Sequence, residues 1–337
     1  MSSTRKKIIL ICLGALCVLF FGLCLFTGSV NIPFNETWSV LFGGEASKST
    51  WTTIITELRV PMAVTAAFAG AALGVAGLLL QTTFNNPLAG PSILGVSTGA
   101  SLGVAVLLLS APSFFDPATS AIIGATVGAL AIIAVLLGFS TVVRSAMMLL
   151  IVGIMVSYLT SSIISLLNFY ATQEGVHSYV IWGLGNFSGL GSDSLLIFSI
   201  LVIILLGLSL LMVKPLNAFL LGERYSANIG INVSLSRNII LLISGGLTAV
   251  VTAFCGPISF LGLAVPHVAR LLLHTSNHKV LLPATILVGA VTGLLTLFLA
   301  MLPGQRGMLP INAITPIIGV PVVIYIILNR RKLNYFN

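Results

Sequence analysis

Apolar blocks separated by short polar breaks run along the whole chain. Each block is close to the roughly 20 residues that an α-helix needs to cross a lipid bilayer. The pattern predicts about ten membrane-spanning helices, near residues 8–28, 59–81, 93–111, 118–139, 146–168, 194–213, 236–255, 258–273, 281–302 and 312–329. An even number of spans places both termini on the same side of the membrane. We therefore expect an all-α, polytopic membrane protein in which residues 1–337 form a single transmembrane domain.

Three polar stretches interrupt this pattern. Residues 31–58 and 172–192 are too polar to span, and we expect the second to form a short surface helix. Residues 81–91 (QTTFNNPLAGP) directly follow a predicted span and contain two prolines and paired asparagines. Unpaired backbone groups are costly in hydrocarbon, so broken helices at membrane depth line a protein interior or a water-filled cavity. Residues 81–91 are therefore predicted to line a pathway.

A weak internal similarity links two parts of the chain. Arg59 precedes a Gly/Ala-rich span that ends at a Gly-Pro break, residues 90–91, and Arg237 precedes a span that ends at residues 256–257, also Gly-Pro. The first span starts outside and the second starts inside. Such an inverted pair is typical of transporters built from repeated halves, and a chance similarity is the alternative.

Composition supports a membrane protein. The chain is 57% hydrophobic and 7% charged, whereas soluble domains carry about 25% charged residues. The first block follows the basic residues 5–7, is long for a secretory signal and lacks a small-residue cleavage site, so we interpret it as a retained span. The four cysteines lie in predicted spans without metal-ligand spacing, which is typical of small packing residues.

The basic residues fall mostly on one side of the predicted spans. If both termini are cytoplasmic, 12 of the 15 lysines and arginines lie on the inner side. Because Lys and Arg near span ends favour the cytoplasm, we expect a multi-pass protein of the cytoplasmic (inner) membrane with both termini inside. This sorting explains the basic pI, so nucleic-acid binding is not indicated.

Several kinds of chemistry are missing from the predicted spans. No Asp, Glu or Lys lies well inside a span and no phosphate-binding loop is present. An ion-coupled secondary transporter remains a remote alternative, and an intramembrane enzyme lacks the necessary side chains. We predict no catalytic residue, metal site or cofactor in this chain, and structural or interfacial roles for His267, His274 and His278. Energy for uphill transport must then come from a partner.

A candidate partner-binding segment lies on the inner side, at about residues 215–230. It is predicted to form a short helix, a joint at Gly222 and a second helix that ends at Gly230. Its apolar residues Leu216, Phe219 and Leu220 are candidates to fill a groove on a soluble protein. An ordinary interfacial loop is the alternative.

Compound motifs follow one another in order over about residues 59–328. They are RVP (59–61), GAAL (70–73), Gln81, NPLAGP (86–91), LGVSTGA (94–100), LGE (221–223), ANIG (227–230), GPISFLGL (256–263) and PHVAR (266–270). With these motifs the chain resembles the permease family of bacterial ABC importers for iron–siderophore, haem and cobalamin.

The resemblance implies a type II ABC importer permease fold and an alternating-access mechanism. It implies a homodimer, or a pair with a paralogous permease, together with two cytoplasmic ATPase subunits that bind ATP and Mg²⁺, and an extracytoplasmic substrate-binding protein. The family pattern places a cytoplasmic gate at Asn86 and Leu88. It places the contact with the ATPase at Leu220, Gly222, Glu223, Ala227 and Gly230.

The resemblance also implies basic residues that dock the binding protein. Arg59 fits one such position, whereas Met62 replaces a second arginine that is common in the family. Arg306 is a candidate replacement for another missing arginine. By resemblance the expected substrate is a ferric siderophore, with haem or cobalamin as the alternatives.

Overall fold

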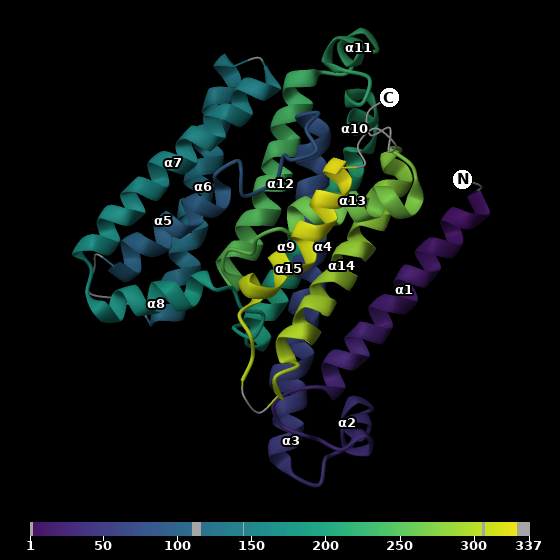
Figure 1. Cartoon of the computed structure of the whole chain (residues 1–337), viewed down its shortest axis with the longest axis vertical. Coiled ribbons are helices and arrows are strands. Elements are labelled where there is room, and N and C mark those ends of the chain that lie inside the picture. Colours follow the sequence, from purple (N-terminus) through teal and green to yellow (C-terminus); the bar gives the residue numbers. More distant parts are fainter. Residues whose placement is uncertain (1–2, 110–115, 144, 305–306, 329–337) are drawn as a thin grey trace.

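The computed structural model is helical throughout, and it describes residues 3–109, 116–143, 145–304 and 307–328 (Figure 1). Within these ranges seven helices have the length and apolar composition to cross a membrane. They contain α1 (Ser3–Phe26), α4 (Val60–Thr83), α6 (Pro117–Val142), α7 (Ala146–Tyr170), α9 (Ser192–Leu211), α12 (Val233–Cys255) and α14 (His278–Met301).

The other three predicted spans correspond to shorter apolar helices. These are α5 (Val96–Leu109), α13 (Leu261–Leu273) and α15 (Ile311–Leu328). Each follows a non-helical break that contains proline, at residues 84–95 and 256–260 and, within the described part of the third break, at residues 302–303 and 307–310. A break of this kind shortens the helix because proline lacks a backbone donor and restricts the preceding residue. The ten predicted spans thus correspond to seven long helices and three shorter apolar ones among the described residues.

Short helices occupy the polar stretches between the long ones. Helix α8 (Gln173–Gly183) confirms the short helix predicted within residues 172–192. Residues 31–58 contain α2 (Phe34–Leu41), α3 (Ser49–Thr53) and most of a π-helical turn (Ile54–Arg59) that leads into α4. The candidate partner-binding segment contains α10 (Val213–Phe219) and α11 (Glu223–Asn228).

Side-chain oxygens fix the residues at which several helices begin. The Asp116 carboxylate accepts a hydrogen bond from the Thr119 N–H at 3.0 Å, directly before α6. Asn232 plays the same part at the start of α12, and Asn277 does so at the start of α14. Each cap satisfies a backbone donor that the first helical turn leaves unpaired. The hydrogen bonds from Thr119 also lower the pKa of the Asp116 carboxyl group.

Helix α4 is the centre of the bundle. In its most apolar window 83% of the residues are buried, compared with 17% in α1 and in α9. It contacts α12, α13 and α14 (Figure 1). A Cβ atom added at Gly77 would lie 1.6 Å from the Gly262 carbonyl oxygen of α13. Small residues therefore allow α4 to approach its neighbours at backbone distance, which is how helices pack where lipid removes the hydrophobic drive.

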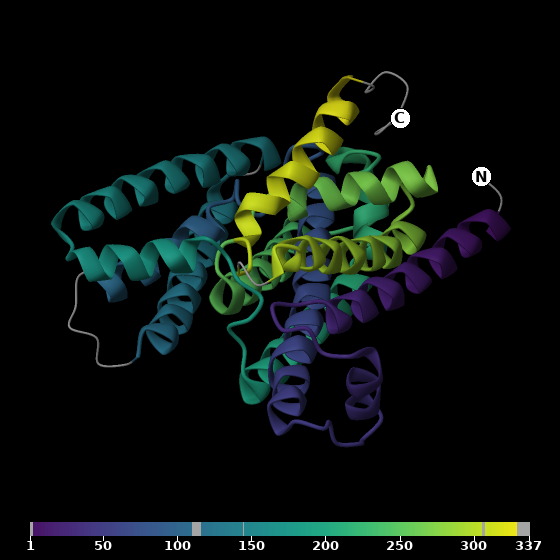
Figure 2. The same ribbon diagram turned by 60° about the horizontal axis from the view of Figure 1, so that its bottom comes forward.

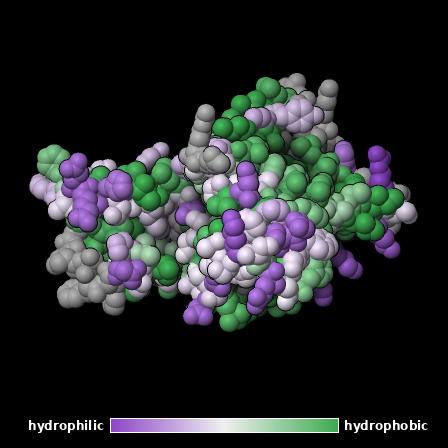
Figure 3. Space-filling view, turned by 90° about the horizontal axis from the view of Figure 1, so that it is seen from below, coloured by the Kyte–Doolittle hydropathy of each residue, from purple (hydrophilic) through white to green (hydrophobic). Residues whose placement is uncertain are grey.

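The two ends of the bundle differ. Helices α10 and α11 lie at one end, towards which α1 begins and α15 ends, and α2 and α3 form a cap at the opposite end (Figures 1 and 2). Figure 3, which looks onto the α2–α3 end, shows hydrophilic side chains gathered over this cap. Within the cap the Glu36 carboxylate accepts hydrogen bonds from the side chain and backbone of Ser47, which lower the pKa of Glu36.

Candidate functional site

The predicted gate residues lie in one tight turn at the end of α4. The Asn85 N–H donates to the Thr82 carbonyl at 3.2 Å and the Asn86 N–H donates to the Gln81 carbonyl at 3.1 Å. Asn85 has a φ of 46°, so α4 ends in a Schellman motif with asparagine in the place usually taken by glycine. The Asn86 side-chain oxygen then accepts from the Leu88 N–H at 2.9 Å. Leu88 projects from this turn and is 44% exposed.

Buried polar side chains anchor this turn to α13. Gln81 donates to the Leu263 carbonyl at 3.1 Å and accepts from the Arg270 guanidinium at 2.6 Å. The His267 Nε2 atom lies 2.8 Å from the carbonyl oxygen of Pro87. Because a carbonyl oxygen only accepts, Nε2 is the ring nitrogen of His267 that carries the proton. Breaking either contact would leave a buried polar group unpaired, which is costly. The contact with Pro87 gives His267 the structural role predicted for it.

The joint between α10 and α11 depends on glycine. Gly222 has φ 96° and ψ 155°, a backbone conformation that strains any residue with a Cβ atom. Helix α11 ends in a second Schellman motif, in which Gly230 has a φ of 86° and its N–H donates to the Ala227 carbonyl at 3.0 Å. The predicted sequence of helix, glycine joint and helix end is confirmed.

The apolar surface of this segment differs from the one predicted. Leu216 and Phe219 are buried inside the bundle and Leu220 is half-buried, because α10 packs against α4, α9 and α14. Leu216 and Phe219 are therefore unavailable to fill a partner's groove, and that prediction was wrong for these two residues. The exposed apolar side chains of the segment are Leu221 (62%), Tyr225 (50%) and Ile229 (52%).

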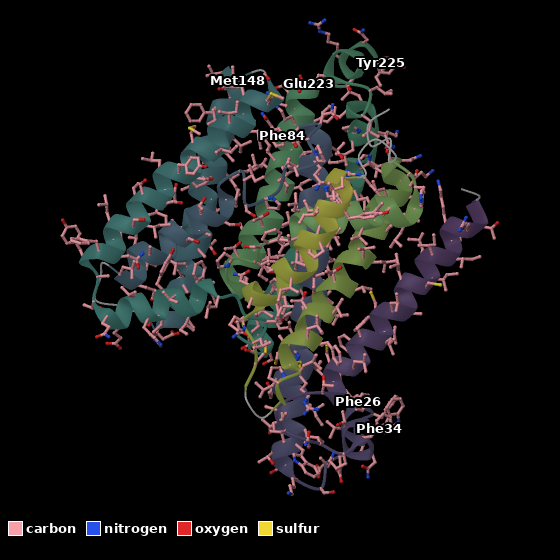
Figure 4. All side chains as sticks on the ribbon, viewed as in Figure 1. Phe26, Phe34, Phe84, Met148, Glu223 and Tyr225 are labelled. Carbon is pink, nitrogen blue, oxygen red and sulfur yellow. The ribbon has the colours of Figure 1, made fainter. Side chains whose placement is uncertain are left out.

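Spacing could have identified part of this surface. Tyr225 and Ile229 are four apart and lie on one face of α11 and the turn that ends it, whereas Leu221 lies before the Gly222 joint, where the helical repeat is interrupted. Glu223 and Arg224 beside them are exposed as well. Figure 4 shows Glu223 and Tyr225 at the same end of the bundle as Phe84. Phe84 begins the turn that contains the predicted gate residues, residues 84–90, which we call the gate turn. The gate turn and the α10–α11 segment therefore share one end of the molecule.

Comparison with known proteins assigns this architecture to a family. The profile of the FecCD transport family matches residues 16–329. The chain belongs to the FecCD transport family. A solved structure of an inward-facing conformation, assigned to the metal-chelate type of ABC transporter, aligns with a TM-score of 0.82 at 29% identity. The alignment covers 96% of this chain and 99% of that one.

Curated relatives of this FecCD chain include permeases with different named substrates. The molybdate import system permease protein MolB of Haemophilus influenzae is 33% identical over 270 residues, covering 80% of this chain and 79% of MolB. The vitamin B12 import system permease protein BtuC of Klebsiella pneumoniae is 31% identical over 314 residues, covering 92% and 93%. The chain is thus a multi-pass permease of an ABC importer with the type II fold, and this family works with ATPase and binding-protein partners.

Arg59, the residue predicted to dock a binding protein, has a structural role in this FecCD permease. Its side chain is 3% exposed. The guanidinium donates to the carbonyl oxygen of Leu25 at 2.7 Å, in the last turn of α1, and to that of Val30. A cation at the carboxyl end of a helix is favourable because unpaired carbonyl groups gather there. The side chain therefore fastens the start of α4 to the end of α1.

Arg237 makes the equivalent attachment at the start of α12. It is also 3% exposed, and its Nη2 atom donates to the carbonyl oxygens of Ser140 at 3.3 Å and Val143 at 3.2 Å, where α6 ends. Helices α4 and α12 run in opposite directions (Figure 1). The two similar segments therefore have a further feature in common, since in each of them the arginine binds carbonyl groups at the end of another helix.

The remaining docking candidate is Arg306, which lies outside the described residues. The α2–α3 end does present exposed aromatic residues. Phe34 and Trp38 lie on α2 and Phe42 directly follows it, and Phe34 stacks on Phe26 at the end of α1 with 4.6 Å between ring centroids (Figure 4). Aromatic side chains of this kind are typical of the boundary between membrane and water. The aromatic row lies beside the end of α1.

Proposed function

We propose that two copies of this chain form the permease of an ATP-driven importer for a bulky metal chelate. A ferric siderophore is the first candidate, and haem or cobalamin is the alternative. Two ATPase subunits bind the α10–α11 end and a binding protein delivers the chelate at the α2–α3 end. The α10–α11 end is then cytoplasmic, which agrees with the predominance of basic residues on that side of the predicted spans.

We propose that the exposed face of α7 lines the substrate path between the two copies, and its lack of charge carries the choice of substrate. Among the described residues α7 contains no ionisable carboxylate, lysine or arginine, and its exposed side chains include Met155, Tyr158 and Phe169. A small dianion such as molybdate needs compensating charge along its path, whereas a bulky chelate with apolar and aromatic groups can be lined by such residues. This observation favours a chelate over the oxyanion named for MolB.

The substrate is tested by uptake into proteoliposomes. The chain is reconstituted with its ATPase and binding-protein partners, and ATP-dependent uptake is measured for a ferric siderophore, haem, cobalamin and molybdate. We expect uptake of a chelate and none of molybdate, and a non-hydrolysable nucleotide should abolish it. Uptake of molybdate alone would refute the proposed substrate class and leave the permease assignment intact.

We propose that the gate consists of Asn86 and Leu88 from each copy. The ATPase then contacts Leu220, Gly222, Glu223, Ala227 and Gly230, with Leu221, Tyr225 and Ile229 as the principal apolar contacts. ATP-driven movement of the ATPase subunits displaces the α10–α11 segment, and the two permease copies alternate between outward-open and inward-open states.

The apolar contact predicts that Leu221→Asp weakens ATPase binding by about 10-fold or more, because burying a leucine stabilises an interface by roughly 1.5–3 kcal/mol. The matched control is Leu235→Asp on α12, where the leucine is 56% exposed, compared with 62% for Leu221. Affinity is measured in detergent with labelled ATPase subunits. Equal effects of the two substitutions would remove Leu221 from the interface.

A further inference from the structure

A chain of hydrogen bonds links the α10–α11 segment to the gate turn. Asn217 lies on α10, His278 is the first residue of α14, and Thr82 lies in the last turn of α4. The His278 Nδ1 atom is 3.0 Å from the side-chain oxygen of Asn217, and its Nε2 atom is 2.8 Å from the Thr82 hydroxyl. The side chains of Thr82 and His278 are buried, and that of Asn217 is half-buried.

The donors and acceptors of this series of hydrogen bonds fit together in only one way. The Asn217 oxygen also accepts from the His278 backbone N–H at 2.8 Å, so it acts as an acceptor towards both the backbone N–H and the Nδ1 atom of His278. His278 Nδ1 therefore carries the proton, and Nε2 accepts from the Thr82 hydroxyl. The Asn217 side-chain nitrogen donates to the Asn277 side-chain oxygen at 3.2 Å, which fixes the orientation of the amide. A satisfied buried network of this kind resists rearrangement.

Thr82 connects this chain to the gate through its backbone. Its carbonyl oxygen accepts the Asn85 N–H at 3.2 Å, one of the two hydrogen bonds that close the Schellman motif at the end of α4. Asn85 has the positive φ that turns the chain towards Asn86 and Leu88. A shift of Thr82 therefore displaces the gate turn directly. The helices involved are in contact, since α10 packs against both α14 and α4.

We infer that Asn217, His278 and Thr82 are positioning residues that transmit movement of the α10–α11 segment to the gate. The inference rests on the proposed function, in which the ATPase displaces that segment. If α10 moves, the three hydrogen-bonded side chains either move with it or lose their hydrogen bonds. Losing these hydrogen bonds leaves buried polar groups without partners. The movement therefore reaches Thr82 and the gate turn, rather than being absorbed between α10 and α4.

The inference is tested with Thr82→Val, which removes the hydroxyl and keeps the side-chain volume. In proteoliposomes that contain the ATPase and binding protein, we expect the amount of substrate transported per ATP hydrolysed to fall roughly tenfold. Asn217→Ala should lower it similarly. The double variant should transport no less substrate per ATP than the more affected single variant, because both substitutions interrupt the same series of hydrogen bonds. Additive losses would show two independent effects and overturn the inference.

Two further variants separate coupling from simple packing. Thr285→Val on α14 removes an equally buried hydroxyl, whose hydrogen bond to Leu281 at 2.8 Å stays within its own helix, and should leave the transport ratio unchanged. Thr82→Ser restores the hydroxyl without the methyl group and should recover most of the ratio. If Thr82→Ser fails as Thr82→Val does, methyl packing is responsible and the inference is wrong.

Hydrogen exchange tests the same link without any substrate. Binding of ATP to the assembled complex should change the amide protection of residues 84–90 in the wild type and not in Thr82→Val. If ATP binding changes the protection of these residues in Thr82→Val as much as in the wild type, the inference is overturned, while the wild-type response still supports the proposed function. A wild-type chain that recruits no ATPase would refute the proposed function and, with it, this inference.

Discussion

Replacing Gly77 with alanine should prevent the central helix from packing. A Cβ atom at this position would lie 1.6 Å from the carbonyl oxygen of Gly262 and 2.6 Å from its carbonyl carbon. Both atoms are backbone, so no side-chain rotation relieves the overlap and α4 must separate from α13. Overpacking in a close-packed interior costs about 1–3 kcal/mol and more where the backbone must move. We expect the unfolding temperature to fall by about 4 °C or more.

The chain supplies both the probe and the control for this prediction. The buried free thiols of Cys24 and Cys255 become reactive on unfolding, so a thiol-reactive dye in detergent reports the transition. Gly138 lies within α6 with no atom within 4 Å of an added Cβ. Gly138→Ala should therefore leave the unfolding temperature unchanged or slightly raised. A wild-type transition for Gly77→Ala would contradict the close approach of α4 and α13.

The second large effect is expected from Arg59→Glu. The new carboxylate would face the carbonyl oxygens of Leu25 and Val30, which both lose their donor. A buried charge without a partner is destabilising by about 3–5 kcal/mol, so little folded protein should remain. Arg59→Lys keeps the positive charge with fewer hydrogen-bond donors and should retain part of the stability. Yield and thermal unfolding in detergent measure both effects.

This substitution also decides between two roles for Arg59. If the guanidinium docks an acidic binding protein, Arg59→Glu should fold normally and weaken docking mainly at low salt, because exposed charge pairs are screened. If it fastens α4 to α1, the loss of folding comes first and is insensitive to salt. A stably folded Arg59→Glu variant with weakened docking would contradict the structural role.

The sequence predicted the fold because the bilayer limits the possibilities. Every predicted span contains a helix, since an apolar stretch in hydrocarbon must satisfy its backbone within itself. The three short helices escaped this reasoning. Residues 93–95 and 258–260, for example, are apolar enough to count as span and yet lie in breaks. Hydropathy does not separate an apolar residue in a helix from one in a turn enclosed by protein.

The candidate site was predicted where backbone geometry dictates the residue. Gly222 and Gly230 have positive φ values, and the turn around Asn86 is set by its own side chain. Burial could not be predicted in the same way. Leu216 and Phe219 read as an exposed apolar face because neither their spacing nor their type reveals that α10 folds back against the bundle. The burial of Arg59 could not be predicted for the same reason, since an arginine next to a span is usually exposed.

The position of α4 in the bundle has a consequence for how the protein is made. The helix enters the membrane early in synthesis, yet the residues that cover it, such as Gly262 and Gly289, leave the ribosome late. Until then its close-packing glycines and its polar end at Gln81 face lipid or the insertion machinery. The strongly apolar α1, with a mean hydropathy of 3.0 against 2.1 for the α4 segment, holds the nascent chain in the bilayer meanwhile. Truncated products that end before α13 should therefore be recognised as unassembled and degraded.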